Sequence, residues 1–444
     1  MSLPQMPWIL SYGKRHIIVN ILTMTETLPA IIDKCEIEVP GSKSYTHRLL
    51  IASALSDGKC SLTNCLKSED TLLTLEALRL MGVKIENLEK EVIVYGSKGL
   101  LKAYDKPVYL ANSGTSMRLL TGVAALGDGD YTLTGTERMS QRPIQDLLDG
   151  LNSLGVEARS VNNNGCPPVV IKGGKIKGGY IELKCNISSQ FLSSVLLISP
   201  YTEKGIKIKV VEGPVSKPYI DMTIDIMAKL GVNVSRDGYT GFSVDGQQNY
   251  KAGSFSVEPD CSQAGYFWAA AAITGSEIKV KGITKDSRQG DLKLTGLFEK
   301  MGCKVYFESD GIIVKGGPLV GIETDMSDMP DMVPTLAVVA AFARGTTVIK
   351  NVEHLKAKES DRLSAVINEL SKTGIEAKSV GSDLVIKGGI PKGARIDTYN
   401  DHRIAMSFAV VGLKTPGIII EDKKCVEKSF PNFWDVFANL VISK

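Results

Sequence analysis

Short polar clusters, each followed at once by an apolar stretch, recur along the chain. The apolar residues of each stretch repeat at helical spacing, so each cluster predicts the start of a helix. Six such clusters, 70 to 74 residues apart, begin at Gly41, Asn112, Asn186, Asp260, Asp331 and Asp401. Self-similarity at a fixed period indicates repeated copies of one structural unit. The sequence therefore predicts six copies of one unit.

A second helix is predicted in each of the first five units. It ends at a glycine 41 to 45 residues after the polar cluster, and these glycines are Gly82, Gly155, Gly231, Gly302 and Gly374. Glycine suits the position just after a helix, where the backbone often turns left-handed. Alternating segments such as VEARS and PPVVIKG follow and predict pairs of strands. One unit is therefore a strand, a helix, a strand, a helix and two strands.

The sixth unit lacks residues for its closing strands, because its glycine would fall at the last position, 444. The spare strands lie near the N-terminus, around 16–21 and 36–39. We therefore expect the two chain ends to meet in one domain, formed by residues 1–41 and 258–444. Residues 42–257 then form a second domain inserted into the first, with three units in each domain.

Composition narrows the classes of function. The chain has 444 residues, of which 43% are hydrophobic, and a net charge of +3 at pH 7. This charge is too small to indicate a nucleic acid or a membrane surface as partner. No segment has the length and apolar character of a membrane helix or a signal peptide. The eight cysteines form no C-x-x-C pair and no metal-binding spacing, which is typical of a reducing cytoplasm. We expect a cytoplasmic protein without a metal site.

Anion binding is the chemistry that the polar clusters favour. Ser, Thr, Asn and Asp cap helix starts, where free N–H groups and the helix dipole attract negative charge. A basic residue also precedes each second helix: Lys67, Arg138, Lys217, Arg288, Lys358 and Lys428. For any one of them a solvated turn is the simpler interpretation. Their recurrence predicts two electropositive faces that meet across a cleft.

The densest cluster is PGSKSYTHR at 40–48, which contains Lys43, Ser44 and Arg48. It lacks the spacing of a nucleotide-binding P-loop. We interpret it as an anion site, although an ordinary capped helix start would use the same residue types. SSQF at 188–191 offers hydroxyls and an amide for hydroxyl or phosphate recognition. Arg118, one helical turn after the cluster at Asn112, suits an anion contact and an internal ion pair equally.

Two carboxylates stand among these cations. Asp331 precedes an apolar helix and fits either a helix cap or a general base toward a substrate hydroxyl. The segment KESDR at 358–362 alternates in charge as a solvated helix face would. In a binding site, Lys358 and Arg362 would hold anions and Glu359 would be a candidate for proton transfer.

Together these motifs resemble the enolpyruvyl transferase family. PGSKS, N-x-GT-x-MR, RM-x-x-RP, SSQF, SKPYID, KE-x-DR, NDHR and K-x-FP occur in this order between 40 and 431. The resemblance implies a two-domain inside-out α/β barrel of six βαβαββ repeats, with helix starts facing the cleft between the domains. It implies transfer of the enolpyruvyl group of phosphoenolpyruvate to the 5-hydroxyl of shikimate 3-phosphate, with release of phosphate. It further implies a monomer that needs no metal or organic cofactor.

The resemblance also assigns the site. It implies contacts to shikimate 3-phosphate for Lys43, Ser44, Arg48, Ser188, Ser189, Gln190, Ser216 and Lys358. It implies contacts to phosphoenolpyruvate for Lys43, Gly114, Arg138, Arg362, Arg403 and Lys428. Asp331 is similar to the base at the 5-hydroxyl, Glu359 to the group that handles the proton at the methylene carbon, and Lys43 joins them as catalytic. Gly114 further implies inhibition by glyphosate, which occupies the phosphoenolpyruvate site.

Some positions depart from the family pattern, and two rival functions stay open. His354 stands where many members have Asn against the shikimate ring, and Leu119 where Pro is frequent. A sibling enzyme that acts on a UDP-amino sugar has Asn in place of Ser44 and needs a reactive loop cysteine, for which Cys166 is the only loop candidate. A non-catalytic module for anions or RNA ends would not need Asp331 and Glu359.

Overall fold

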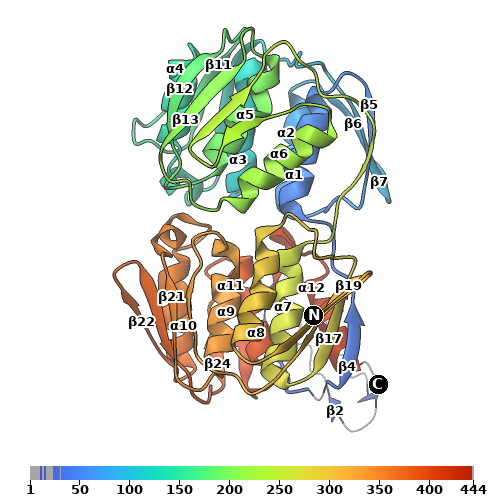
Figure 1. The fold of residues 1–444 in the computed structure, drawn as a ribbon, viewed down its shortest axis with the longest axis vertical. Helices are drawn as coiled ribbons and strands as arrows, with labels where there is room; N and C mark the ends of the chain where they lie inside the picture. Colours follow the sequence, from blue (N-terminus) through green and yellow to red (C-terminus); the bar gives the residue numbers. More distant parts are fainter. Residues whose placement is uncertain (1–10, 13–14, 17–23, 31, 443–444) are drawn as a thin grey trace, which may run out of the picture.

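The computed structural model describes residues 11–12, 15–16, 24–30 and 32–442. Two lobes are stacked along the long axis, and the chain passes between them twice (Figure 1). Each lobe surrounds its own core of buried hydrophobic side chains. The upper lobe contains the core of residues 45–257, and the lower lobe contains the core of residues 32–39 and 261–440.

The upper lobe has helices and sheets in three similar groups. Its helices are α1 (Lys43–Leu55), α2 (Glu69–Leu80), α3 (Gly114–Leu126), α4 (Gln145–Ser153), α5 (Gln190–Ile198) and α6 (Pro218–Lys229). The first sheet has the order β16 (Ser254–Ser256), β5 (Lys59–Thr63), β7 (Glu91–Tyr95), β6 (Lys84–Asn87). The second has the order β10 (Glu157–Ser160), β11 (Val169–Gly173), β9 (Gly129–Thr134), β8 (Val108–Tyr109). The third has the order β12 (Gly179–Lys184), β13 (Ile206–Glu212), β15 (Gly241–Val244), β14 (Ser235–Asp237).

The lower lobe repeats this plan. Its helices are α7 (Cys261–Thr274), α8 (Leu294–Lys300), α9 (Val333–Ala340), α10 (Arg362–Lys372), α11 (His402–Val411) and α12 (Phe433–Ile442). One sheet has the order β18 (Lys304–Glu308), β19 (Gly311–Lys315), β17 (Glu277–Lys281), β4 (Lys34–Ile37). The next has the order β20 (Glu323–Asp325), β21 (Thr346–Lys350), β23 (Asp383–Lys387), β22 (Glu376–Val380). The last contains β24 (Ala394–Ile396), β25 (Ile418–Ile420) and β3 (Thr25–Thr27).

The predicted unit is confirmed in its order of elements and in its helix ends. In the second unit, for example, β8 lies parallel to β9 with α3 between them in sequence, and β10 and β11 follow α4. The five glycines predicted to end the second helices all have φ between 79° and 112°. Residues with a Cβ are disfavoured in that left-handed region, which explains why glycine recurs there.

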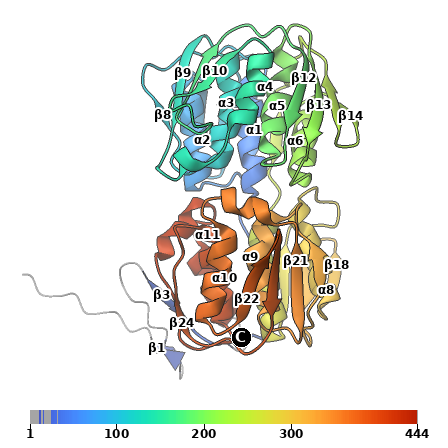
Figure 2. The same ribbon diagram turned by 90° about the vertical axis from the view of Figure 1, so that its left-hand side faces the viewer.

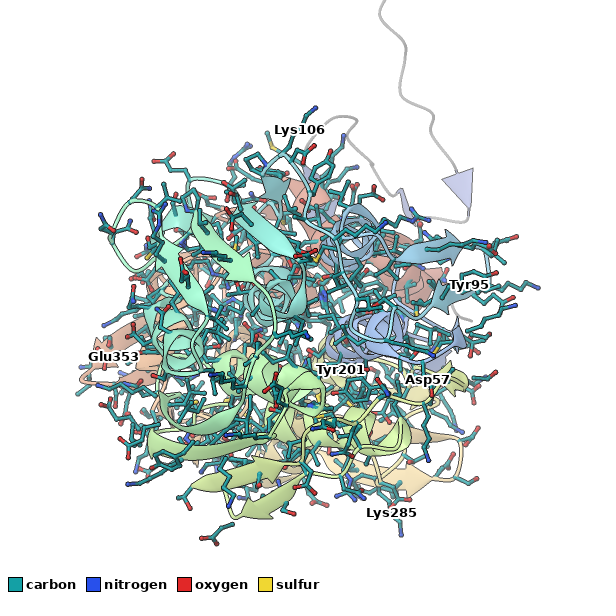
Figure 3. The ribbon with its side chains drawn as sticks, turned by 90° about the horizontal axis from the view of Figure 1, so that it is seen from above. Asp57, Tyr95, Lys106, Tyr201, Lys285 and Glu353 are labelled. Atoms are coloured by element: carbon teal, nitrogen blue, oxygen red, sulfur yellow. The ribbon has the colours of Figure 1, made fainter. Side chains whose placement is uncertain are left out.

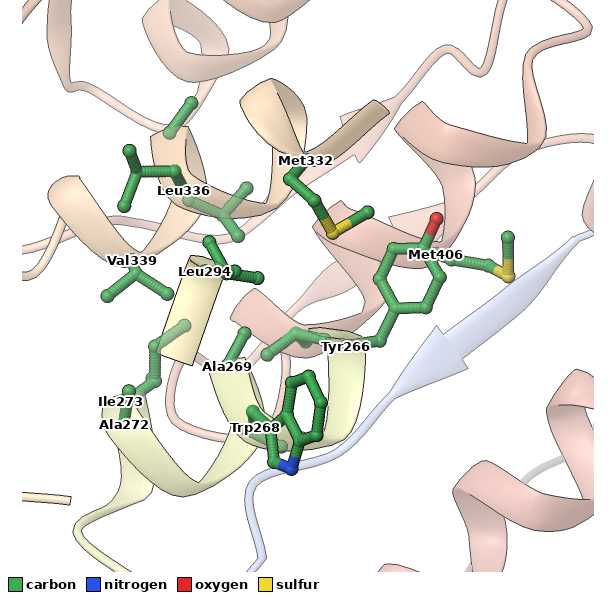
Figure 4. Close-up of a cluster of buried hydrophobic side chains, with 14 of the residues drawn as sticks. Tyr266, Trp268, Ala269, Ala272, Ile273, Leu294, Met332, Leu336, Val339 and Met406 are labelled. Atoms are coloured by element: carbon green, nitrogen blue, oxygen red, sulfur yellow. The ribbon is translucent and has the colours of Figure 1, made fainter. Parts of the chain in front are cut away.

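The first helix of each unit is buried on nearly every side. α1, α3, α5, α7, α9 and α11 have few exposed residues, whereas α2, α4 and α10 each have an exposed face. An all-round apolar helix is expected inside a protein. Seen from above, helices lie end-on within surrounding strands (Figure 3). In the lower lobe, α7 and α9 contribute Ile273 and Val339 to one buried cluster (Figure 4).

The strand that closes the sixth unit is not the one predicted. The segment expected to close the sixth unit, 36–39, overlaps β4, which instead lies parallel to β17 and completes the fourth sheet. The sixth sheet is closed by β3, which pairs antiparallel with β25. Of the other expected strand, residues 17–21 lie outside the described residues, and His16 pairs within the hairpin of β1 (Ser11–Tyr12) and β2 (Arg15–His16). The N-terminal chain therefore contributes strands to two sheets of the lower lobe (Figure 2).

The two crossings exchange first strands between the lobes. β4 precedes α1 in sequence but lies in the lower lobe, and β16 precedes α7 but lies beside β5 in the upper lobe. At the crossing point, Ser42 N–H donates to Glu258 O at 2.8 Å and Asp260 N–H donates to Pro40 O at 2.9 Å. Asn64 lies against both crossings, because its Nδ2 donates to Val257 O at 2.8 Å and its own carbonyl contacts Gly41. None of the helices within the described ranges is long and apolar enough to cross a membrane.

Gly41 is predicted to be required at this crossing. A Cβ at position 41 would lie 1.8 Å from Asn64 O, a backbone atom that cannot move alone. We expect Gly41→Ala to lower the free energy of unfolding by about 1–3 kcal/mol, the usual cost of an overpacked site. Gly174→Ala is the matched control, because nothing lies within 4 Å of its Cβ. Equal denaturation midpoints for the two variants in urea would contradict this role.

Candidate active site at the junction of the lobes

The lobes meet through polar contacts between helix starts and the turns beside them. The contacts are Asp70 Oδ1–Lys428 Nζ at 2.8 Å, Arg142 Nη2–Glu359 Oε1 at 3.7 Å, and Arg138 Nη2 to the carbonyls of Lys356 at 2.9 Å and Lys358 at 3.0 Å. Asn112 Nδ2 also donates to Glu359 O at 3.3 Å, and Ser216 N–H donates to Ser327 O at 3.1 Å. Residues predicted for the site therefore lie at one junction, from both lobes.

Asp70 joins a cation of each lobe. Its Oδ2 lies 3.2 Å from Lys43 Nζ at the start of α1, and its Oδ1 lies 2.8 Å from Lys428 Nζ of the lower lobe. All three side chains are buried. Burial raises the pKa of the Asp70 carboxyl, but Lys428 and Lys43 outweigh it and lower the pKa to about 2. The carboxylate thus stays charged and holds both ammonium groups at the junction.

Arg362 binds three carboxylates at once. Its Nη1 lies 2.7 Å from Asp331 Oδ1, its Nη2 lies 2.7 Å from Glu359 Oε2, and its Nε lies 2.8 Å from Asp401 Oδ2. The guanidinium is 1% exposed. Burial alone would lower its pKa, but the three carboxylates raise it. The planar guanidinium, with five N–H donors, suits contact with three carboxylates at once.

Asp331 and Arg403 form the next part of the network. Arg403 Nη2 lies 2.9 Å from Asp331 Oδ2, and Arg403 Nη1 donates to Tyr266 OH at 3.0 Å. Asp401 caps α11 by accepting from Arg403 N–H at 2.9 Å. Burial raises the pKa of the Asp331 carboxyl, but Arg403 and Arg362 outweigh it and hold the pKa far below its ordinary value. Asp331 is therefore ionised while both arginines face it.

Glu359 and Gly114 lie where the lobes touch. Burial raises the pKa of the Glu359 carboxyl, but Arg362 and Arg142 hold it well below its ordinary value. Arg142 reaches this carboxylate past the start of α3, where Gly114 is the first helical residue. A Cβ on Gly114 would lie 2.4 Å from Arg142 Nη2. Glycine therefore leaves room here for a guanidinium, or for a ligand in contact with it.

The hydroxyl and amide side chains of the upper lobe lie at the start of α5 and before α6. Ser188 and Ser189 are buried, and Gln190 is held by Arg118 Nη1 at 3.0 Å and by Thr115 Oγ1 at 2.9 Å. Arg118 thus acts inside the protein. Ser216 has a left-handed φ of 56°, and its buried Oγ has no hydrogen-bond partner in the described part of the chain. An orphaned buried hydroxyl at a polar junction is a ready ligand contact.

Three further residues predicted for the substrate site, Arg48, Ser44 and Lys358, differ in their burial and contacts. Arg48 is 1% exposed and holds α1 against α6, donating to Thr223 Oγ1 at 2.7 Å and to Tyr219 O at 3.1 Å. Ser44 is half-buried, and its carbonyl accepts from Arg48 Nη1 at 3.0 Å. Lys358 lies at the end of a 3-10 turn beside Asp331 and Arg362, and burial lowers the pKa of its ammonium to about 8.

Sequence patterns missed several members of this network, chiefly the internal carboxylate Asp70. The periodic basic residue next to it, Lys67, was expected at the electropositive face, but its Nζ donates to the carbonyls of Leu88 and Glu89. Arg288, from the same series, is exposed. The position of Asp70 in the first turn of α2 could have drawn attention to it. Acidic residues are common in first helical turns, however, because they interact favourably with the helix dipole.

Cysteines and potential metal ligands are the remaining candidate groups. Across the described ranges, no group of three or more His, Cys, Asp or Glu residues is arranged to hold a metal ion. All eight cysteines are free thiols. Cys166, the loop candidate for a reactive thiol, is 8% exposed and its burial raises the pKa of its thiol. A raised pKa disfavours the nucleophilic thiolate.

Comparisons with known proteins agree with this arrangement. Residues 33–437 match the model of the family described as EPSP synthase (3-phosphoshikimate 1-carboxyvinyltransferase). A 3-phosphoshikimate 1-carboxyvinyltransferase of Syntrophobacter fumaroxidans is 41% identical over 410 residues, which is 92% of this chain and 97% of the relative. The enzyme of the same name from Methanosphaera stadtmanae is 39% identical over 412 residues, which is 91% of this chain and 96% of the relative.

Solved structures lead to the same family. The structure of EPSP synthase from Acinetobacter baumannii superposes with a TM-score of 0.81 at 30% identity, covering 95% of this chain and 99% of that chain. The predicted inside-out α/β fold and the predicted resemblance are thereby confirmed. The match extends through the motifs that surround the junction, from Lys43 to Lys428. On this evidence, the chain belongs to the EPSP synthase (3-phosphoshikimate 1-carboxyvinyltransferase) family.

Proposed function

We propose that the junction of the lobes binds shikimate 3-phosphate and phosphoenolpyruvate and catalyses transfer between them. The chain transfers the enolpyruvyl group to the 5-hydroxyl of shikimate 3-phosphate and releases phosphate. The observation that carries the site is the network of Lys43, Lys428, Arg362 and Arg403 around internal carboxylates. The phosphate and carboxylate groups of these substrates can pair with the same cations that the internal carboxylates neutralise in the absence of substrate. We further propose that residues 42–257 and residues 1–41 with 258–444 are the two domains of a cytoplasmic monomer.

The proposed substrate contacts follow the network. Phosphoenolpyruvate binds among Lys43, Arg138, Arg362, Arg403 and Lys428, with the backbone at Gly114 beside it. Shikimate 3-phosphate takes the adjoining polar surface, and its contacts are Lys43, which it shares with phosphoenolpyruvate, Ser44, Arg48, Ser188, Ser189, Gln190, Ser216 and, from the lower lobe, Lys358. The orphaned Ser216 hydroxyl and the buried ammonium of Lys358 support this division. Arg48 contributes to this site by holding the start of α1, because its Nη1 donates to Ser44 O.

Asp331 is the proposed base for the 5-hydroxyl, and the substrates themselves prepare it. Without substrate, Arg362 and Arg403 hold its pKa too low for a good base. When the phosphate or carboxylate of phosphoenolpyruvate binds these arginines, it neutralises part of their charge, so the pKa of Asp331 rises. The base is therefore activated only when the second substrate is present. Attack of the 5-oxygen on C2 of phosphoenolpyruvate then forms a tetrahedral ketal.

Glu359 is the proposed acid and base at the methylene carbon. It gives a proton to C3 when the ketal forms and takes one back from the resulting methyl group when phosphate leaves, so its net protonation does not change. Asp331 passes the proton taken from the 5-hydroxyl to the departing phosphate, so both carboxyl groups return to their starting states. Its pKa is also held low by Arg362 and Arg142, and competition from substrate anions raises it. Buried cations beside the phosphate disperse the developing charge.

Phosphate release is the direct test of the proposed function. We expect inorganic phosphate from phosphoenolpyruvate to appear only when shikimate 3-phosphate is also present. A UDP-amino sugar in its place should give none, in keeping with Ser44 and the inert surroundings of Cys166. Release that requires the UDP-sugar, or that needs neither acceptor, would contradict the proposed reaction.

The variant Asp331→Asn tests the role of Asp331 as a base separately from substrate binding. The amide keeps the shape of the carboxylate but cannot accept a proton, so we expect kcat to fall about 100-fold or more. Affinity for shikimate 3-phosphate, measured by calorimetry, should stay within about threefold. Asp310→Asn is the control, since Asp310 is exposed and pairs with Lys279 away from the junction. Wild-type kcat in Asp331→Asn would refute the assigned base.

Lys358 gives the binding site a pH dependence. A lysine binds phosphate as an ammonium, and burial lowers its pKa to about 8. The charged form dominates below that pH and is lost above it, so affinity for shikimate 3-phosphate should fall about tenfold between pH 7 and pH 9. Lys358→Arg should remove this decline, because arginine stays charged throughout. The same decline in both proteins, measured by calorimetry, would show that Lys358 is not responsible.

A further inference from the structure

A buried line of hydrogen bonds joins the N-terminal halves of helices α1, α2 and α3. His47 Nδ1 of α1 lies 2.8 Å from Thr74 Oγ1 of α2, which lies 2.8 Å from Ser116 Oγ of α3. Ser116 Oγ also lies 2.7 Å from Ser113 Oγ and 3.2 Å from Asp70 O. His47, Thr74, Ser113 and Ser116 are each 0% exposed. The line ends on the backbone of the residue whose carboxylate holds Lys43 and Lys428.

The direction of the hydrogens follows from the His47 end of the line. The other ring nitrogen, Nε2, is buried without a hydrogen-bond partner among the described residues, so the hydrogen of a neutral ring belongs on Nδ1, which donates to Thr74 Oγ1. Thr74 then donates to Ser116 Oγ, and Ser116 donates to Asp70 O, a carbonyl that only accepts. Ser113 fits the same order, because Ser116 Oγ can accept a second hydrogen bond.

The surroundings of His47 keep the ring neutral. Burial is the largest cause that lowers its pKa, to about 3, and Lys43, Arg48 and Lys428 lower it further against the opposing effect of Asp70. A neutral ring with a hydrogen on Nδ1 has a bare Nε2, and this buried atom has no hydrogen-bond partner among the described residues. A bare acceptor is the less costly atom to leave unpaired, since an orphaned buried N–H is the rarer case.

We infer that His47, Thr74 and Ser116 are positioning residues, whose one-directional hydrogen bonds fix the Asp70 backbone and thereby aim its carboxylate at Lys43 and Lys428. None of the three needs to touch substrate. Their effect passes through Asp70 to the two ammonium groups that meet phosphoenolpyruvate, one from each lobe. This inference rests on the proposed function for its kinetic consequence, but the hydrogen order itself does not.

The hydrogen order is measurable without any turnover. The chain has only 4 histidines, so the ring nitrogens of His47 can be assigned by NMR of histidine-labelled protein, with a His47→Gln variant for the assignment. We expect the Nδ1–H form in the wild type at neutral pH. Thr74→Val removes the acceptor of that hydrogen and should shift the ring toward the Nε2–H form, whereas Thr74→Ser keeps the hydroxyl and should not. A wild-type ring in the Nε2–H form would overturn the inference.

Kinetics test the link to the lysines. Ser116→Ala removes the donor to Asp70 O, and we expect KM for phosphoenolpyruvate to rise about threefold to tenfold, the usual range for one lost hydrogen bond, with kcat within about twofold. Ser199→Ala is the matched control, because Ser199 is 0% exposed and its Oγ donates to Val195 O at 2.7 Å within one helix. Thermal midpoints of both variants show whether they lose similar stability.

The outcomes separate the two proposals. Equal KM values in Ser116→Ala and Ser199→Ala at similar stability would overturn the positioning role, because a merely structural hydroxyl would behave in this way. A wild type that releases no phosphate would instead contradict the proposed function, and the NMR result would then decide the hydrogen order alone. A KM that rises only in Ser116→Ala, with an Nδ1–H ring in the wild type, supports the whole inference.

Discussion

Buried cations from two lobes face one another at the junction, and internal carboxylates neutralise them. Asp70 pairs Lys43 with Lys428, and Arg362 pairs with Asp331, Glu359 and Asp401. Taking such charges out of water is costly, and only good geometry with further hydrogen bonds offsets that cost. The network is therefore weak evidence for stability and stronger evidence for a site that must bind charge.

The repeat explains how so many cations reach one place. Six copies of one unit each bury the first helix, so the start of that helix can point along the lobe toward its partner lobe. The exchange of β4 and β16 between lobes places both crossings beside α1 and α7, and the hydrogen bonds of Ser42 and Asp260 hold these helix starts together. The position of Lys43 is thus fixed by the crossing on one side and by Asp70 on the other.

Sequence periodicity predicted the units well because it reports local physics. Helix starts, left-handed glycines such as Gly82 and the alternating strands depend on neighbours in sequence, and all agree with the structure. The partner of each strand depends on tertiary packing, so nothing local distinguished β4 in the fourth sheet from a strand that closes the sixth. Cations were recognisable from their motifs, whereas Asp70 resembles any acidic residue in a first helical turn. Its importance arises only when Lys428, 358 residues away, reaches it.

The central claim is that one substrate anion is held by cations of both lobes at once. The most direct measurement is calorimetric titration with shikimate 3-phosphate of the wild type and of Lys43→Met and Lys358→Met, one variant from each lobe. The account predicts that each single change weakens binding about tenfold or more, because a charge-assisted contact to phosphate is lost. Wild-type affinity in either variant, with the fold intact, would show that this lobe does not take part in binding and would contradict the account.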